Sequence, residues 1–237
     1  MKWRFCPLGD QALLIELGDQ ISSETQQHIQ MFSHFLEGQR LPWLKECIPA
    51  YTNIAVFYDI WKVSQLCGKD QLPYEFVCAE LHELLKSVDI QTHLSSRKID
   101  IPVCYGGEFG PDLDEVARLN HLTPDEVITI HAAGDYLVHM IGFAPGFPFI
   151  GGMSEKIAAP RRKSPRLQIP ARTVGIAGMQ TGVYPIETPG GWQLIGRTPI
   201  ELFTPEGEMP TLLRAGDRIQ FKPISFEEYK QLEAEQS

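Results

Sequence analysis

Residues 142–199 constrain the fold of this chain more than any other segment. Their 58 positions hold ten of the 20 glycines and eight of the 18 prolines. Glycine weakens a helix and proline lacks the amide donor, so a segment this rich in both is not helical. Large apolar residues such as Phe147, Ile176 and Trp192 are interleaved with them, which is not typical of a polar linker. The segment therefore predicts tight loops that join short strands around a packed core.

Length, charge and cysteine content limit the class of protein. A chain of 237 residues suits one large domain or two small ones. The net charge of −9 argues against a nucleic acid or an anionic membrane as the main partner. No apolar run is long enough to span a bilayer, and no secretion signal is visible at the start. The five cysteines form no CxxC pair, which predicts reduced thiols in a cytoplasmic protein and no metal site.

The N-terminal part has the pattern of a small α/β domain. Apolar segments at residues 12–17 and 53–58 predict strands. Ser23 and Gln26 have the spacing of a capping box, which predicts the start of an amphipathic helix. A second amphipathic helix is predicted over residues 74–88. These two strand–helix passages predict a ferredoxin-like or related α+β sandwich.

A polar segment separates the two predicted domains. Residues 91–98, which end in Ser95-Ser96-Arg97-Lys98, have the composition of a linker. We therefore expect a first domain over residues 1–95, a second over residues 99–224 and a short C-terminal helix over residues 225–237.

Capping patterns mark the helices of the second domain. Asp112 with Glu115 predicts a helix near residues 112–121. Thr123 with Pro124 predicts another near residues 124–133, where proline at the first helical position costs nothing. The remaining predicted elements are strands over residues 99–103, 136–141 and 215–221, and a C-terminal helix that starts at Ser225 with Glu228.

Positive charge gathers inside the glycine-rich and proline-rich segment. No acidic residue lies between Glu155 and Glu187. Because arginine pairs well with carboxylates and phosphates, this basic island predicts a site for an anionic substrate or for an acidic partner. The alternative is a solvated loop, or arginines paired with acidic residues of the other domain. The island comprises Lys156, Arg161, Arg162, Lys163, Arg166 and Arg172.

Two histidines and a group of aromatic residues are further candidates. His131 and His139 flank the predicted strand at residues 136–141, and imidazole titrates near neutral pH, so either is a candidate general base. A lone histidine is more often a structural residue. The aromatic residues either line an apolar pocket or docking groove, or form the core of a small barrel. They are Phe143, Phe147, Phe149, Tyr184 and Trp192.

Two other motifs are excluded. Gly106-Gly107-Glu108-Phe109-Gly110 lacks the Lys-Ser/Thr of a Walker loop, so it does not predict a phosphate site. The chain also lacks an Ala-Met-Lys-Met segment, so no biotin attachment site is expected.

Several of these motifs together resemble a known family. The chain is similar to the B subunit of the bacterial ATP-dependent 5-oxoprolinase, a group that includes the sporulation-kinase inhibitor KipI. The same module resembles the first subunit of allophanate hydrolase and part of the carboxyltransferase region of urea amidolyase. The resemblance covers nearly the whole chain. Its motifs are Pro49-Ala50-Tyr51-Thr52-Asn53, Ile101-Pro102-Val103-Cys104-Tyr105-Gly106-Gly107, Gly110-Pro111-Asp112-Leu113 and the segment from Gly142 to Pro199.

The resemblance implies a fold and an activity. The implied fold is an N-terminal ferredoxin-like α/β domain followed by a C-terminal cyclophilin-like β-barrel. The implied activity is the opening of 5-oxoproline to glutamate at the expense of ATP, together with the C and A subunits as partners. ATP is expected on a partner, because no nucleotide motif is visible here.

The resemblance also implies roles for single residues. Arg161 or Arg166 would bind the substrate carboxylate, and His139 would be a candidate for proton transfer. The same cleft would be lined by Gln180, Tyr184 and Arg197.

A binding role is the alternative to the enzyme role. KipI-type members hold a histidine kinase inactive, and an apolar groove on the barrel could dock the helices of such a kinase. Exposed aromatic residues would then matter more than the arginines. The docking residues implied by this alternative are Phe143, Pro145, Phe147 and Trp192.

The sequence departs from the family pattern at two places. Arg172-Thr173 stands where Gly-Ser is usual, which removes backbone freedom and adds charge. Phe149 stands where tyrosine is usual, which removes one hydroxyl.

Overall fold

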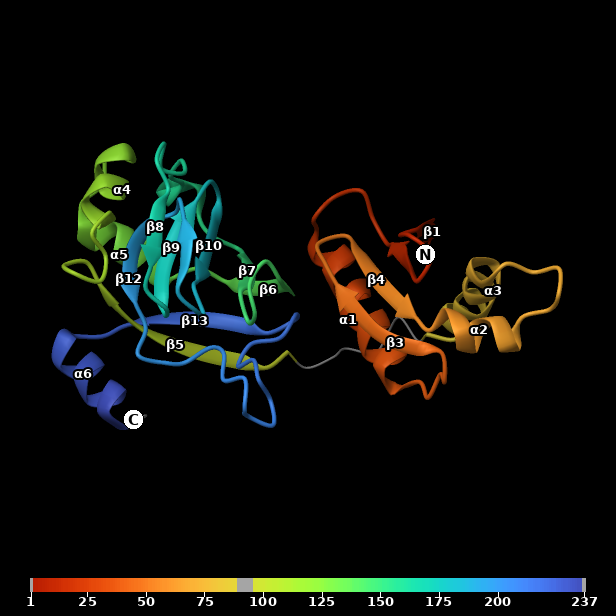
Figure 1. Cartoon of the computed structure of the whole chain (residues 1–237). Helices are drawn as coiled ribbons and strands as arrows, with labels where there is room; N and C mark the ends of the chain where they lie inside the picture. The colour runs from red at the N-terminus through yellow and green to blue at the C-terminus, as the bar shows by residue number, and fades with distance from the viewer. Residues whose placement is uncertain (1, 89–95, 236–237) are drawn as a thin grey trace. The chain divides into compact units, whose positions relative to one another are not determined.

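The computed structural model describes residues 2–88 and 96–235, whose contacts divide into two compact units (Figure 1). The first unit comprises Met1–Ser95 and the second Ser96–Ser237. Most of the predicted linker, residues 91–95, lies outside the described residues. Each unit has its own hydrophobic core.

The first unit is a four-stranded antiparallel sheet with three helices. The strands lie in the order β1-β2-β4-β3. Both predicted strands are confirmed, and Ile29 and Phe32 of the first helix are buried in the core with them. The elements are β1 Arg4–Pro7, β2 Ala12–Glu16, α1 Ser23–Gly38, β3 Leu44–Pro49, β4 Asn53–Tyr58, α2 Ile60–Leu66 and α3 Pro73–Lys86.

The start of α1 differs from the predicted capping box. The capping residue is Ser22, whose hydroxyl accepts a hydrogen bond from the Thr25 amide at 3.0 Å. Gln26 donates instead from its side chain to the Tyr51 carbonyl at 2.6 Å. The prediction was one residue off because Ser22 and Ser23 are consecutive in the sequence, and serine at either position suits a helix cap.

The second unit is built around a closed barrel of seven strands in the order β10-β7-β6-β13-β5-β12-β9. Strands β13 and β5 pair in parallel and the other neighbours pair antiparallel. A separate two-stranded sheet is formed by β8 and β11. The strands are β5 Lys98–Tyr105, β6 Tyr136–Ile141, β7 Pro148–Gly151, β8 Arg166–Ile169, β9 Thr173–Ala177, β10 Gln180–Val183, β11 Thr188–Gly190, β12 Gln193–Arg197 and β13 Arg218–Pro223.

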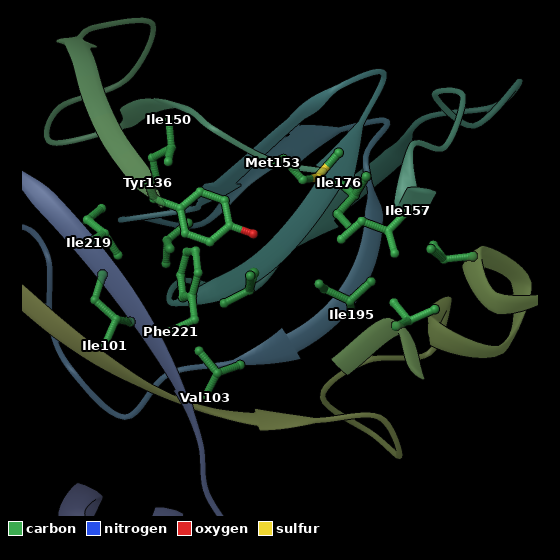
Figure 2. Packing of buried hydrophobic residues seen from close by; sticks show 14 of the residues in the cluster. Ile101, Val103, Tyr136, Ile150, Met153, Ile157, Ile176, Ile195, Ile219 and Phe221 are labelled. Atoms are coloured by element: carbon green, nitrogen blue, oxygen red, sulfur yellow. The ribbon is translucent and has the colours of Figure 1, made fainter. Parts of the chain in front are cut away.

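Side chains fill the inside of this barrel. Figure 2 shows Tyr136 and Phe221 packed among isoleucines such as Ile101, Ile176 and Ile219. All five are buried, so the barrel interior is a core and any ligand site must lie outside it.

Short helices complete the second unit. Thr123 and Glu126 form the predicted capping box at the start of α5, with hydrogen bonds in both directions. Ser225 and Glu228 are joined in the same reciprocal way at the last helix. The helices are α4 Leu113–Leu119, α5 Pro124–Ala132, the 3₁₀ turn η1 Glu155–Ile157 and α6 Phe226–Glu235.

Asp112 does not cap α4 as predicted. It has the capping position but makes no side-chain hydrogen bond to the helix. Its carboxylate accepts hydrogen bonds from Arg162, Arg166 and the Leu194 amide instead.

Candidate functional site

A cavity of about 230 Å³ opens on the second unit, outside the barrel core. Its walls come from the turn between β6 and β7, from β7, from the loop before β8, from the residue that follows β10, from strand β11 and from the residues just before β12. This volume is below the range typical for drug-sized ligands, so it suits a small molecule. The lining residues are Phe143, Phe147, Phe149, Arg161, Tyr184, Pro189, Gly190, Gly191 and Trp192.

Edge-to-face aromatic contacts build the apolar wall of the cavity. The ring of Phe147 lies 5.2 Å from that of Phe149, 5.7 Å from Tyr184 and 5.8 Å from Trp192. Tyr184 and Trp192 also meet edge to face at 6.2 Å. These separations are typical of attractive aromatic pairs, so the rings form a rigid wall. Phe149, which stands where the family pattern has tyrosine, belongs to this wall.

The burial of this wall corrects part of the docking prediction. Phe147 is 3% exposed and Trp192 is 7% exposed, so neither presents a surface to a protein partner. Phe143 and Pro145 are exposed, and Phe143 keeps 75% of its surface in solvent. Sequence alone could not separate these residues, because all of them lie in one loop-rich segment.

Phe143 sits on a strained turn at the rim of the cavity. Its φ is +70°, and the Ala144 amide donates to the Gly142 carbonyl at 2.8 Å. A hydrogen bond across one residue at positive φ defines the rare γ-turn, which costs free energy for a side chain as bulky as phenylalanine. The turn holds the Phe143 ring 5.5 Å from Phe147, over the rim of the wall.

Tyr184 places a neutral hydroxyl in the cavity. Burial raises the pKa of its phenol to about 12, despite a backbone hydrogen bond with Trp192 and the charges of Arg161 and Arg166. A Cβ on Gly190 would lie 2.5 Å from the Tyr184 oxygen, so only glycine leaves room for this hydroxyl. The phenol is therefore a hydrogen-bond donor at physiological pH.

Arg161 is the charged residue among those that line the cavity. Its side chain is exposed, and within residues 2–88 and 96–235 no carboxylate pairs with it. A guanidinium without a partner beside an apolar wall is a suitable site for the carboxylate of a small organic acid.

Three other cations of the basic island, Arg162, Arg166 and Arg172, have carboxylate partners within the second unit. Arg162 and Arg166 bind the buried carboxylate of Asp112. Arg172 binds Glu233 of α6 at 2.9 Å. The expectation that Arg166 grips a substrate is therefore revised, since two of its nitrogens already bind Asp112. The alternative of pairing with the other domain is also wrong for these three residues.

Arg172 stands where the family pattern has glycine, and neighbouring groups stabilise this residue. Its φ is +69°, a conformation that glycine adopts without strain. The guanidinium offsets this cost by donating to the Pro199 carbonyl at 3.0 Å and to Glu233. The arginine therefore ties the start of β9 to the C-terminal helix.

Two predicted cleft residues lie away from the cavity lining. Gln180 begins β10 and pairs with Ala177 of β9. Arg197 ends β12, donates to the Ala171 carbonyl at 3.1 Å and covers the Phe109 ring at 5.8 Å. Neither lines the cavity, so the structure brings together Arg161 and Tyr184 but not the full predicted set.

Neither candidate histidine lies in the cavity. His131 is fully buried between the Tyr105 and Thr181 hydroxyls, at 2.7 and 2.8 Å. Burial lowers its pKa to about 3, so His131 cannot act as a base by accepting a proton near neutral pH. His139 packs against Gly151 on β7, and burial lowers its pKa as well.

Two other features are absent from the part of the chain that the structure describes. No group of three acidic, histidine or cysteine side chains could hold a metal ion there. The helices of that part are each too short or too polar to span a bilayer.

Comparisons with known proteins agree on one family. The protein-family model for the carboxyltransferase domain, subdomain C and D, matches residues 3–213 of this chain. The B subunit of 5-oxoprolinase from Bacillus subtilis (strain 168) is 51% identical over 230 residues, which cover 97% of this chain and 96% of that protein. Its counterpart in Escherichia coli O157:H7 is 40% identical over 216 residues, or 91% and 94% of the two chains. Among solved structures, that of TTHA0988 matches with a TM-score of 0.77 and 32% identity, covering 91% of this chain and 40% of that one.

Proposed function

Because the chain belongs to the family of the carboxyltransferase domain, subdomain C and D, we propose that it is the B subunit of a 5-oxoprolinase. In this role it takes part in opening 5-oxoproline to glutamate with the hydrolysis of ATP. The full-length match to proteins of that name supports the assignment.

The unpaired guanidinium of Arg161 beside an aromatic wall is the observation that carries the substrate assignment. 5-Oxoproline is a five-membered lactam ring that bears one carboxylate. In our proposal Arg161 binds the carboxylate, the rings of Phe147 and Trp192 pack on the lactam ring, and Tyr184 donates a hydrogen bond to it. A cavity of about 230 Å³ suits a ligand of this size.

Catalysis is proposed to need the partner subunits. The cavity lining contains no nucleophile with an adjacent base, and His139 lies outside it. A nucleoside triphosphate is larger than the cavity, and several cations would be needed to bind its phosphates, whereas Arg161 is the one cation among the described residues that line the cavity. We therefore place ATP on or with a partner, with the A and C subunits of the enzyme as the partners, and expect the isolated chain to be inactive.

Two further assignments accompany this proposal. The strand order β1-β2-β4-β3 of the first unit is that of a ferredoxin-like sandwich in which the strand that usually comes last in the chain, here β1, comes first. The barrel of the second unit is cyclophilin-like. A cytoplasmic location is supported by the five free thiols.

Inhibition of a histidine kinase is the second candidate function. The exposed ring of Phe143 on its strained turn favours it, because an exposed aromatic residue held in place is a typical interface anchor. Phe143→Ala should abolish inhibition of kinase autophosphorylation, while Leu167→Ala, which removes another exposed apolar side chain, should not. Equal effects of the two variants would argue against this function.

The enzyme function is tested with matched arginine and lysine variants of the assembled complex. Arg161→Ala should raise the KM for 5-oxoproline about a hundred-fold, because it removes a charge-assisted contact with the substrate. Lys163→Ala removes an exposed cation of the same loop that does not line the cavity, and it should leave this KM unchanged. An unchanged KM in Arg161→Ala would refute the substrate assignment.

A further inference from the structure

We propose that Asp112 is a positioning residue for Arg161, a role that rests on the function proposed for the cavity. Asp112 touches no part of the cavity itself. It acts by fixing the segment that carries Arg161 against the start of β12, which directly follows the wall residues Gly191 and Trp192.

The carboxylate of Asp112 accepts hydrogen bonds from two segments that are distant in the sequence. Arg166 donates two hydrogen bonds at 2.8 and 2.9 Å, and Arg162 donates one at 3.1 Å. The amide of Leu194, on β12, donates a fourth at 2.7 Å. Asp112 is 5% exposed, so these contacts are shielded from water. One side chain thus joins the loop before β8 to the start of β12.

The charge balance makes this carboxylate hard to replace. The guanidinium groups of Arg162 and Arg166 are both positively charged. With Asp112 in place, one negative charge lies between the two guanidinium groups. Without it, two like charges would face each other beside an unpaired amide, and the loop would have to move to separate them.

The backbone on both sides of Arg161 is fixed to the same strand region. The Pro160 carbonyl accepts a hydrogen bond from the Gln193 side chain at 2.9 Å. The Arg162 amide donates to the Gly191 carbonyl at 2.8 Å. Arg161 is therefore held between two anchored neighbours, and its own side chain lines the cavity while that of Arg162 reaches Asp112.

These contacts set the distance between Arg161 and the aromatic wall. Gly191 and Trp192 line the cavity directly before the segment that binds Asp112 through Leu194. A loop shift of about 1 Å between a binding group and its substrate can cost about a hundred-fold in rate. Loss of the Asp112 carboxylate should therefore weaken the binding of 5-oxoproline without removing any group that touches it.

The test is a double-mutant cycle in the assembled 5-oxoprolinase, with 5-oxoproline and ATP as the varied substrates. Asp112→Asn should raise the KM for 5-oxoproline about ten-fold or more and leave the KM for ATP unchanged. In the Arg161→Ala background, Asp112→Asn should cause no further rise, because the residue it positions is gone. Glu115→Gln is the matched control, since it removes an exposed carboxylate bound to Arg118 three residues away.

Each outcome decides the proposal. An unchanged KM for 5-oxoproline in Asp112→Asn, with a raised KM in Arg161→Ala, would overturn the positioning role and leave the proposed function intact. Additive effects of the two changes would also overturn it, because Asp112 would then act independently of Arg161. An unchanged KM in Arg161→Ala would remove the proposed site itself, and this inference with it. If Asp112→Asn does not fold, Arg166→Lys loses the paired hydrogen bonds but keeps the charge, and it should raise the same KM in the same direction.

Discussion

Acid should destabilise the second unit through His131. This imidazole lies inside the barrel, with the ring of Phe221 at 4.5 Å and hydroxyls on both nitrogens. The Thr181 hydroxyl also donates to the Gly175 carbonyl, so it accepts from Nε2 of His131. The Tyr105 hydroxyl then donates to Nδ1, and both nitrogens are satisfied by the neutral ring. A second proton, on Nδ1, would displace the hydrogen bond that the Tyr105 hydroxyl donates to this nitrogen.

The magnitude follows from the difference between two pKa values. Burial lowers the pKa of His131 from 6.5 to about 3 in the folded protein. As the pH falls below 6.5, the unfolded chain takes up a proton that the folded protein cannot bind. The free energy of unfolding therefore falls by about 1.4 kcal/mol per pH unit below 6.5, until the pH reaches the folded pKa. At pH 4.5 the free energy of unfolding is therefore lower by about 3 kcal/mol at most.

Urea unfolding at several pH values measures this loss. Trp192 is the tryptophan of the second unit and reports its unfolding by fluorescence. The His131→Gln variant keeps a donor and an acceptor but does not titrate, so it serves as the reference for all other acid effects. Between pH 7 and pH 4.5 the free energy of unfolding of the wild type should fall by about 3 kcal/mol more than that of His131→Gln. Equal losses in the two proteins would refute the neutral, buried assignment.

Two further changes test the walls of the cavity. Gly190→Ala should destabilise the second unit by about 1–3 kcal/mol in thermal unfolding, because its Cβ would lie 2.5 Å from the Tyr184 oxygen and 2.7 Å from Ile169; an unchanged melting temperature would contradict the close packing. Tyr184→Phe should leave the shape of the pH profile of kcat/KM between about pH 7 and 9 unchanged, because burial raises the pKa of this phenol to about 12. An alkaline limb near pH 8.5 that vanishes in Tyr184→Phe would contradict the raised pKa.

Regular elements with strong local patterns were predictable from the sequence. Strands β4 and β6 have the predicted bounds, because each is a compact run of apolar residues between polar or small ones. Strand β1, Arg4–Pro7, was not predicted. It has four partly exposed residues and ends in proline, and it is stable as an edge strand because β2 pairs with it.

The site was only partly predictable, because its contacts join residues far apart in the chain. The basic island pointed to Arg161, and the aromatic pattern pointed to Tyr184 and Trp192. The sequence could not say that Asp112 would bind arginines 50 or more residues away rather than cap its own helix, since both uses suit an aspartate at that position. Nor could it separate Phe143 from the buried rings, because burial there depends on how the loops fold over the barrel.

The assignment as a 5-oxoprolinase subunit is tested most directly by 5-oxoproline-dependent ATP hydrolysis in lysates of the source organism, with and without this gene. The account predicts that deletion abolishes the activity and that the purified wild-type protein restores it, whereas the protein alone has none. Activity that persists unchanged after deletion would contradict the assignment and favour the kinase-inhibitor function.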